Sequence, residues 1–258
     1  MPRLEAAAGP LSTPAASLQR RGLVPFLLGT AAVLLLSWGY LLYMDWGMRH
    51  MDVGGDMLLM PRMVGWRAID LLLVFIMWAL MMAAMMLPSA LPAIALYARA
   101  RGNPAAFAAG YLLVWSGFSA LATLLQWRLL EAALLTPMMK SASVPLSASI
   151  LILAGLFQLT PLKDACLHRC RSPLAALLAG NAGPSRAINE GLRNGLNCLG
   201  CCFALMGVLF AVGVMSIPWV LVIAAYVTLE KILPRARWLP RTVGVALCLW
   251  GVMLLVTR

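Results

Sequence analysis

The stretch IDLLLVFIMWALMMAAMMLPSALPAIALY, residues 69–97, decides the fold, because it carries a single charged residue, Asp70, over its whole length. A helix needs about 20 mainly apolar residues to cross the roughly 30 Å hydrocarbon layer of a bilayer. The stretch meets that requirement with residues to spare. It therefore predicts a transmembrane helix.

Six other stretches of the chain are comparably apolar. They cover residues 23–44, 104–127, 144–162, 196–216, 217–233 and 243–257. The stretches 196–216 and 217–233 follow each other directly, and Ile217-Pro218 is the natural place for a turn between them. We therefore expect an all-α polytopic membrane protein with about seven transmembrane helices, or six if one of that pair is re-entrant.

The composition supports the same class. Hydrophobic residues make up 62% of the chain and charged residues 11%, whereas an average soluble domain is about 45–50% apolar and about 25% charged. A soluble fold cannot keep so much apolar surface from water. The composition argues against a soluble enzyme and a disordered protein. The formal net charge of +11 indicates basic loops beside a lipid bilayer rather than nucleic-acid binding.

Lys and Arg predict how the chain lies in the membrane. With the N-terminus inside, 14 of the 20 basic residues fall in inner segments and 6 in outer ones. Basic residues concentrate in cytoplasmic loops. We therefore expect a cytoplasmic N-terminus, a disordered tail over residues 1–22 and a single transmembrane helical domain over residues 23–258.

Five of the six cysteines fall at the inner ends of two expected spans. Cys166 and Cys170 follow the span 144–162, and Cys198, Cys201 and Cys202 open the span 196–216. On helices, spacings of three and four residues place side chains on shared faces. Disulfides do not persist in a reducing cytoplasm, whereas thiolate–metal bonds do. We therefore predict that these five thiols bind a metal ion.

The number and spacing of the cysteines favour copper over zinc. Tetrahedral Zn²⁺ needs four ligands, and the sequence lacks the second Cys-x2-Cys of a zinc ribbon. Cu(I) is satisfied by two or three soft ligands. Cu(I) is therefore the expected ion, with zinc as the alternative.

Methionine is the other soft ligand that the chain concentrates, with 17 residues in total. Met81 with Met85, and Met82 with Met86, form i,i+4 pairs that share helix faces. Six more methionines lie in or beside the first outer loop. Neutral thioether sulfur suits Cu(I), so the two pairs predict a soft-metal path through the second span. The alternative is that these residues fill irregular space in the core.

Charged groups near the membrane have a simpler interpretation. Glu230 and Lys231 close the span 217–233, and we expect an interfacial pair with the lysine reaching out to water. The sequence contains no Ser-His-Asp set, phosphate-binding loop or dinucleotide fingerprint. It therefore indicates no catalytic residues.

Three blocks of sequence together resemble a bacterial family of predicted metal-binding integral membrane proteins of unknown function. The blocks are MWALMMAAMMLPS (77–89), QLTPLK with CLHRCRSP (158–163 and 166–173) and GLNCLGCCFALM (195–206). Phe203 stands where the family often has Trp, and Phe157 where it often has Tyr, so both positions keep an aromatic ring. The resemblance covers most of the chain from the second expected span onward. It implies a metal-binding protein of the bacterial inner membrane.

The leading hypothesis is a membrane protein that handles Cu(I), by uptake or by delivery to a membrane cuproenzyme. Its partner would be a metallochaperone or that enzyme. Methionines outside and within the second span, and thiolates inside, would form a series of increasing affinity for Cu(I). One alternative is a thiol–disulfide membrane oxidoreductase using Cys198 and Cys201, which the inner location disfavours. Another is a non-catalytic membrane subunit in which a structural metal holds the cysteines.

Overall fold

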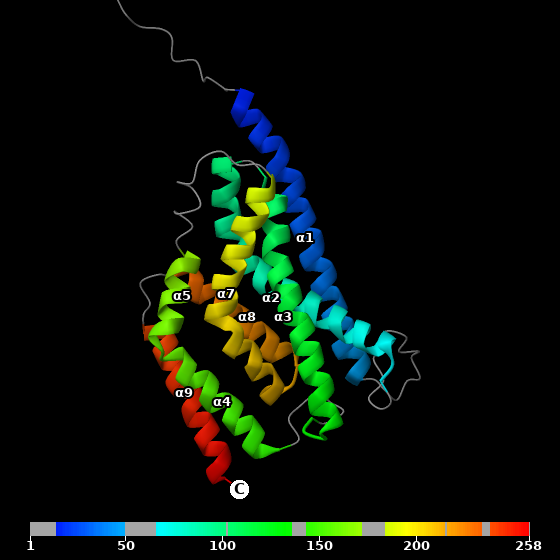
Figure 1. Ribbon diagram of the computed structural model, residues 1–258, viewed down its shortest axis with the longest axis vertical. Coiled ribbons are helices and arrows are strands. Elements are labelled where there is room, and N and C mark those ends of the chain that lie inside the picture. The colour runs from blue at the N-terminus through cyan, green and yellow to red at the C-terminus, as the bar shows by residue number, and fades with distance from the viewer. Residues whose placement is uncertain are drawn as a thin grey trace, which may run out of the picture.

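The computed structural model describes residues 14–49, 66–101, 103–135, 143–171, 184–214, 216–233 and 238–257. Eight α-helices account for most of these residues, as Figure 1 shows, so the prediction of an all-α fold is confirmed for the described chain. Their bounds are α1 Pro14–Arg49, α2 Ala68–Arg101, α3 Pro104–Glu131, α4 Val144–Gln158, α5 Pro161–Arg171, α7 Pro184–Val212, α8 Ile217–Ile232 and α9 Trp238–Val256.

Five of the described helices are long and apolar enough to cross a membrane. They are α1, α2, α3, α7 and α9. The pair α4 and α5 adds a sixth candidate span, bent by 66° at its break. Helix α8 has 16 residues, which is about 24 Å at 1.5 Å per residue and shorter than the hydrocarbon layer. The described residues thus hold five candidate spans, or six with the bent pair, and a total of seven stays a prediction.

Helix boundaries follow local signals in the sequence. Helix α3 begins after Asn103, whose side-chain oxygen accepts a hydrogen bond from the amide of Ala106 at 3.1 Å. Helix α4 begins after Ser143, whose hydroxyl accepts from the amide of Leu146 at 3.3 Å. Both use the side-chain capping that helix N-termini require. Helix α1 begins at Pro14, nine residues before the expected first span, and the rest of the expected tail lies outside the described residues.

Helix α2 supplies much of the core. It continues through Pro88 and Pro92 to Arg101. Around Trp78, the indole nitrogen donates to the side-chain oxygen of Gln126 at 2.7 Å, and the ring stacks on Phe210 with centroids 5.2 Å apart. These contacts join α2 to α3 and α7. The methionines of the expected path are fully buried in this core: Met77, Met81, Met82, Met85 and Met86.

Glycines set the closest helix contacts. A Cβ at Gly191 of α7 would collide with the carbonyl oxygen of Phe107 on α3. A Cβ at Gly155 of α4 would lie 2.6 Å from the carbonyl oxygen of Gly244 on α9. Small residues that let backbones touch are typical of helix pairs in membranes. The packing therefore resembles that of a membrane bundle.

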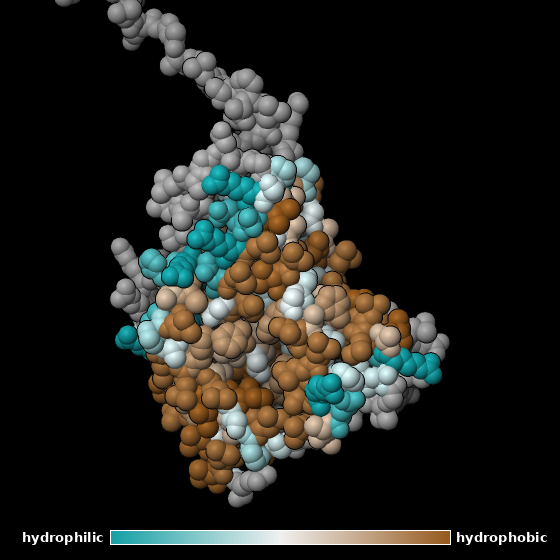
Figure 2. Space-filling model, viewed as in Figure 1, coloured by the Kyte–Doolittle hydropathy of each residue, from teal (hydrophilic) through white to brown (hydrophobic). Residues whose placement is uncertain are grey.

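The surface in Figure 2 shows an apolar body with hydrophilic groups at its edges. Brown, apolar residues cover most of the middle and lower parts of this face, with smaller teal groups at the lower right, and the largest teal group lies over α5 and the beginning of α7. Exposed polar side chains there include His168 and Arg169 of α5 and Arg193 of α7. This end of the molecule is suited to water, and it is the end that carries Cys166 and Cys170.

Candidate metal centre

Four of the five predicted cysteine ligands lie together in the core. Cys198, Cys201 and Cys202 of α7 are 0%, 1% and 1% exposed, and Cys170 of α5 is 8% exposed. The sulfurs of Cys198 and Cys202 are 3.9 Å apart, and those of Cys201 and Cys202 are 3.3 Å apart. The buried thiol of Cys170 on α5 lies near those of Cys198 and Cys201. We call Cys170, Cys198, Cys201 and Cys202 the thiol cluster.

The other two cysteines lie outside the thiol cluster. Cys166 is half-buried, and its sulfur rests on α7, where a Cβ added to Gly200 would lie 3.0 Å away. Cys248 lies on α9, with its sulfur 3.7 Å from the carbonyl oxygen of Ile152. Cys166 thus adjoins the thiol cluster, whereas Cys248 belongs to the α4–α9 contact.

Within the thiol cluster, hydrogen bonds distinguish Cys198 from its neighbours. The thiols of Cys201 and Cys202 both donate to the backbone carbonyl of Cys198, at 3.1 Å and 2.8 Å. The sulfur of Cys198 accepts from the ammonium of Lys231 on α8 at 2.9 Å. An ammonium group can only donate. Cys198 is therefore the sulfur that the surroundings prepare to carry negative charge.

A short polar chain links this sulfur to the end of the methionine run. The ammonium of Lys231 also donates to the hydroxyl of Ser89 at 2.7 Å, and that hydroxyl donates to the carbonyl of Met86 at 2.7 Å. The hydroxyl of Tyr111 donates to the same carbonyl at 3.2 Å and lies 3.0 Å from the sulfur of Cys198. The backbone at Met86 thus lies one side chain away from the thiol cluster.

The predicted methionines have two environments. Met81, Met82, Met85 and Met86 are all buried in the core. Met85 also lines an apolar groove of about 330 Å³ between α1, α2 and α8, with Trp38 and Thr228 among its other walls. The structure therefore places one end of the run beside the thiol cluster and one member beside an open groove.

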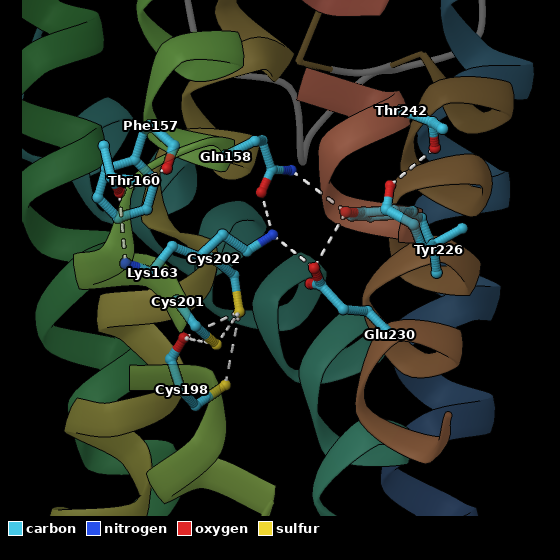
Figure 3. A network of polar contacts seen from close by, with 11 residues as sticks. Phe157, Gln158, Thr160, Lys163, Cys198, Cys201, Cys202, Tyr226, Glu230 and Thr242 are labelled. Carbon is cyan, nitrogen blue, oxygen red and sulfur yellow. Dashed lines mark hydrogen bonds and ion pairs between the residues drawn. The ribbon is translucent and has the colours of Figure 1, made fainter. Parts of the chain in front are cut away.

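A second buried network lies next to the thiol cluster (Figure 3). The ammonium of Lys163 on α5 donates to the carboxylate of Glu230 on α8 at 2.6 Å and also to the side-chain oxygen of Gln158 on α4. The hydroxyl of Tyr226 donates to Glu230 at 3.1 Å. Lys163 and Glu230 form an ion pair that is almost completely buried.

The expectation of an interfacial Glu230–Lys231 pair is wrong. Glu230 pairs with Lys163, and Lys231 turns to Cys198 and Ser89 instead of reaching water. Consecutive residues on a helix point about 100° apart, so neighbours in sequence need not share an environment. Both charges have buried partners on other helices, which removes the reason for either to reach the interface.

The start of α5 explains how Lys163 enters the core. The hydroxyl of Thr160 accepts from the amide of Lys163 at 3.4 Å, and Pro161 follows as the first helical residue. This N-cap restarts the helix after the 66° bend. The new direction points Lys163, Leu167 and Cys170 into the protein.

Sequence reasoning missed five polar residues of these networks. They are Ser89, Tyr111, Gln158, Lys163 and Tyr226. A polar group inside an apolar stretch costs free energy unless it finds a partner. Gln158 and Tyr111 lie inside such stretches, and this was the signal that could have identified them. Lys163 lies at the end of an apolar stretch and three residues before Cys166 in sequence, which predicts a cation near the thiols but not its buried pairing with Glu230.

The thiol cluster is not a closed zinc site. Across the described residues, no three or more His, Cys, Asp or Glu side chains form a group that could hold a metal ion as it stands. Two sulfurs bound to one metal at about 2.3 Å lie about 3.8 Å apart at the tetrahedral angle. The 3.9 Å between Cys198 and Cys202 matches that spacing, so two sulfurs fit one ion with little movement.

The fold and the thiol cluster together define an all-helical protein, compatible with several membrane crossings, whose core gathers ligand types that prefer soft metals. A family model described as PpoB2, copper chaperone, matches residues 75–254. The chain belongs to this copper chaperone family, which supports the expectation from its soft ligands that it handles copper. The matched residues include the methionine run and all six cysteines. No curated protein and no solved structure matches the chain.

Proposed function

We propose that this protein is an integral membrane copper chaperone that holds Cu(I) in the thiol cluster and delivers it to a membrane cuproenzyme. The observation that carries the proposal is the meeting of four buried thiols from α5 and α7 inside the segment that the copper chaperone family covers. Soft thiolates are the ligands that Cu(I) prefers. The long apolar helices support a location in the membrane.

The arrangement of the thiol cluster favours Cu(I) over zinc. Structural zinc requires four ligands in a tetrahedron, whereas the described His, Cys, Asp and Glu side chains form no group of three or more that could hold a metal ion of any kind as it stands. Cu(I) needs only two or three soft ligands. Cys198 and Cys202 supply two such ligands, and the sulfur of Cys201 lies 3.3 Å from that of Cys202 as a third.

Charge balance favours a monovalent ion as well. Cu(I) bound by two thiolates has a net charge of −1, and the ammonium of Lys231 at Cys198 compensates it. A divalent ion with the same two thiolates would be neutral and would leave the lysine uncompensated. Uncompensated charge is costly in a buried site. The positive charge of Lys231 therefore favours a monovalent ion in the thiol cluster.

We propose that the methionine run connects the thiol cluster to copper on the other side of the membrane. The backbone carbonyl of Met86 accepts from Tyr111, whose hydroxyl also lies 3.0 Å from the sulfur of Cys198. Met85 borders the groove between α1, α2 and α8. Neutral thioethers bind Cu(I) more weakly than thiolates, so the series would favour movement toward the cysteines. The proposal keeps the predicted cytoplasmic N-terminus and inner-membrane location. The outer-loop methionines beyond Met48 lie outside the described residues.

The disulfide-exchange alternative meets a steric difficulty. Cys198 and Cys201 are 0% and 1% exposed, whereas exchange requires the attacking thiolate to reach a sulfur of the substrate disulfide. A protein disulfide cannot approach these sulfurs without rearrangement of α5 and α7. Copper, as a single ion, needs far less room.

The test is metal analysis of the protein purified in detergent, with anaerobic Cu(I) titration. We expect stoichiometric Cu(I), lost in the variant Cys198→Ser, Cys201→Ser, Cys202→Ser and kept in the matched control Cys248→Ser. Stoichiometric zinc in place of copper would support the structural-metal alternative. Cu(I) binding equal in the wild type and the triple variant would refute the proposal.

A further inference from the structure

We propose that Cys166 is the exchange thiol of the copper centre, the residue through which Cu(I) passes between the aqueous surface and the thiol cluster. This inference rests on the proposed function and adds to it a point of entry and exit. Cys166 then acts on the rate of copper transfer, whereas the thiol cluster sets the affinity.

The burial of α5 places Cys166 at a border between water and core. Asp164, His168 and Arg169 are exposed, whereas Leu167 and Cys170 are buried. Cys166 is partly exposed, whereas the other four of the five gathered cysteines are buried. Among the five gathered cysteines, a copper carrier therefore meets Cys166 first, while the thiol cluster stays covered.

Further thiols lie inward from Cys166. One turn along α5, the buried Cys170 lies on the same helix face and near Cys198 and Cys201 of α7. The sulfur of Cys166 itself rests on Gly200, the residue before Cys201, where any Cβ would crowd it. A glycine at this position brings the half-exposed thiol against the helix that carries the other sulfurs.

The buried ion pair fixes this geometry. Lys163 lies three residues before Cys166 and is held by Glu230 and Gln158. The first turn of α5 is therefore anchored in the core, so Cys166 stays at the border. Copper moves from sulfur to sulfur along a stationary helix.

The chemistry of the transfer is ligand exchange without a change of oxidation state. A carrier sulfur bound to Cu(I) is replaced by the sulfur of Cys166, which forms the new Cu–S bond and releases its thiol proton to water. Cys170 then forms a Cu–S bond and passes its thiol proton to the sulfur of Cys166. The bond to Cys166 breaks as that sulfur takes the proton. Copper remains Cu(I) throughout, and delivery reverses the same steps. The carrier that fits is a protein or small molecule with exposed thiolate or thioether sulfur.

The experiment compares Cys166→Ser with Cys248→Ser as the matched single-thiol control. Each protein is loaded with Cu(I) in detergent, and bathocuproine disulfonate, a charged Cu(I) chelator confined to water, is added in a stopped-flow instrument. We expect Cys166→Ser to keep its copper stoichiometry and affinity but to transfer copper at least about tenfold more slowly. Cys248→Ser should behave as the wild type.

A second variant leaves all six thiols in place. Gly200→Ala crowds the sulfur of Cys166, with a Cβ 3.0 Å away, and should also slow transfer without loss of bound copper. Wild-type rates in both variants would overturn the exchange role, as would loss of copper stoichiometry in Cys166→Ser, which would make Cys166 a resident ligand. Absence of Cu(I) from the wild type would instead refute the proposed function.

Discussion

The Lys163–Glu230 ion pair offers the sharpest test of the buried architecture. Its atoms lie 2.6 Å apart, and the two side chains are 0% and 1% exposed. Removing one partner from a buried pair leaves an uncompensated charge and costs about 3–5 kcal/mol. We therefore expect Lys163→Met and Glu230→Gln each to lower the free energy of unfolding by about that amount.

The double variant, Lys163→Met with Glu230→Gln, separates the energy of the ion pair from the energy with which each side chain packs. Replacing both partners removes both charges, and such replacements are often close to neutral in stability. We expect the double variant to be more stable than either single variant, with a coupling free energy of at least about 3 kcal/mol in the double-mutant cycle. The hydrogen bonds that Gln158 and Tyr226 make to the pair keep the double variant below the wild type.

The assay is reversible unfolding in mixed micelles, followed by circular dichroism. The matched control is Glu131→Gln, which breaks the ion pair between Arg128 and Glu131, whose side chains are 69% and 51% exposed. An exposed pair contributes between zero and about 1 kcal/mol, so this control should barely change the unfolding free energy. Additive losses in the Lys163 and Glu230 variants would show that the two charges do not stabilise each other, and would refute the reasoning.

Three further variants test other parts of the structure. Gly191→Ala should lower the free energy of unfolding by about 1–3 kcal/mol, because its Cβ would meet the carbonyl of Phe107. The control Gly117→Ala, on α3 with open space around it, should be neutral or stabilising in the same unfolding assay. Lys231→Met removes the ammonium from Cys198 and should weaken Cu(I) binding by roughly tenfold to a hundredfold in a competition titration, since hydrogen bonds to charged groups contribute about 1.5–3 kcal/mol; unchanged affinity would contradict the charge-balance argument. Replacing the buried methionines by leucine should keep the fold and the copper bound by the thiol cluster, while copper delivery to a cuproenzyme in cells falls; undiminished delivery would leave them as packing residues. The methionines concerned are Met81, Met82, Met85 and Met86.

The sequence predicted the helices well because apolar length is a strong signal. The stretch 69–97 became α2 almost as expected, and Ile217 begins α8. The bend between α4 and α5 was not foreseen, because Thr160-Pro161 lies near the end of an apolar stretch that looks continuous. A capping residue followed by proline allows a helix to restart in a new direction, and tertiary packing decides that it does.

The thiol cluster was partly predictable for a similar reason. Spacing along α7 shows that Cys198, Cys201 and Cys202 share a face. Spacing does not show that α5 packs there and adds Cys170 to them. The charged residues show the limit most clearly. Glu230 and Lys231 look like an interfacial pair in sequence, yet each is satisfied by a group far away in the chain: Lys163 in one case and Cys198 in the other. Contacts between distant residues depend on how helices pack, which local patterns do not encode.

The two charged neighbours on α8 also determine its rotational phase. Glu230 faces the α4–α5 network, and Lys231 faces α2 and α7. Inserting one residue ahead of them would turn the end of the helix by about 100° and advance it by about 1.5 Å. Both charges would then leave their partners at once, and Glu230 would turn to the direction that Lys231 now has, toward the sulfur of Cys198. Length changes upstream in α8 are therefore far more damaging than substitutions on its exposed side, and a chimera that exchanges α8 must preserve the residue count up to Glu230.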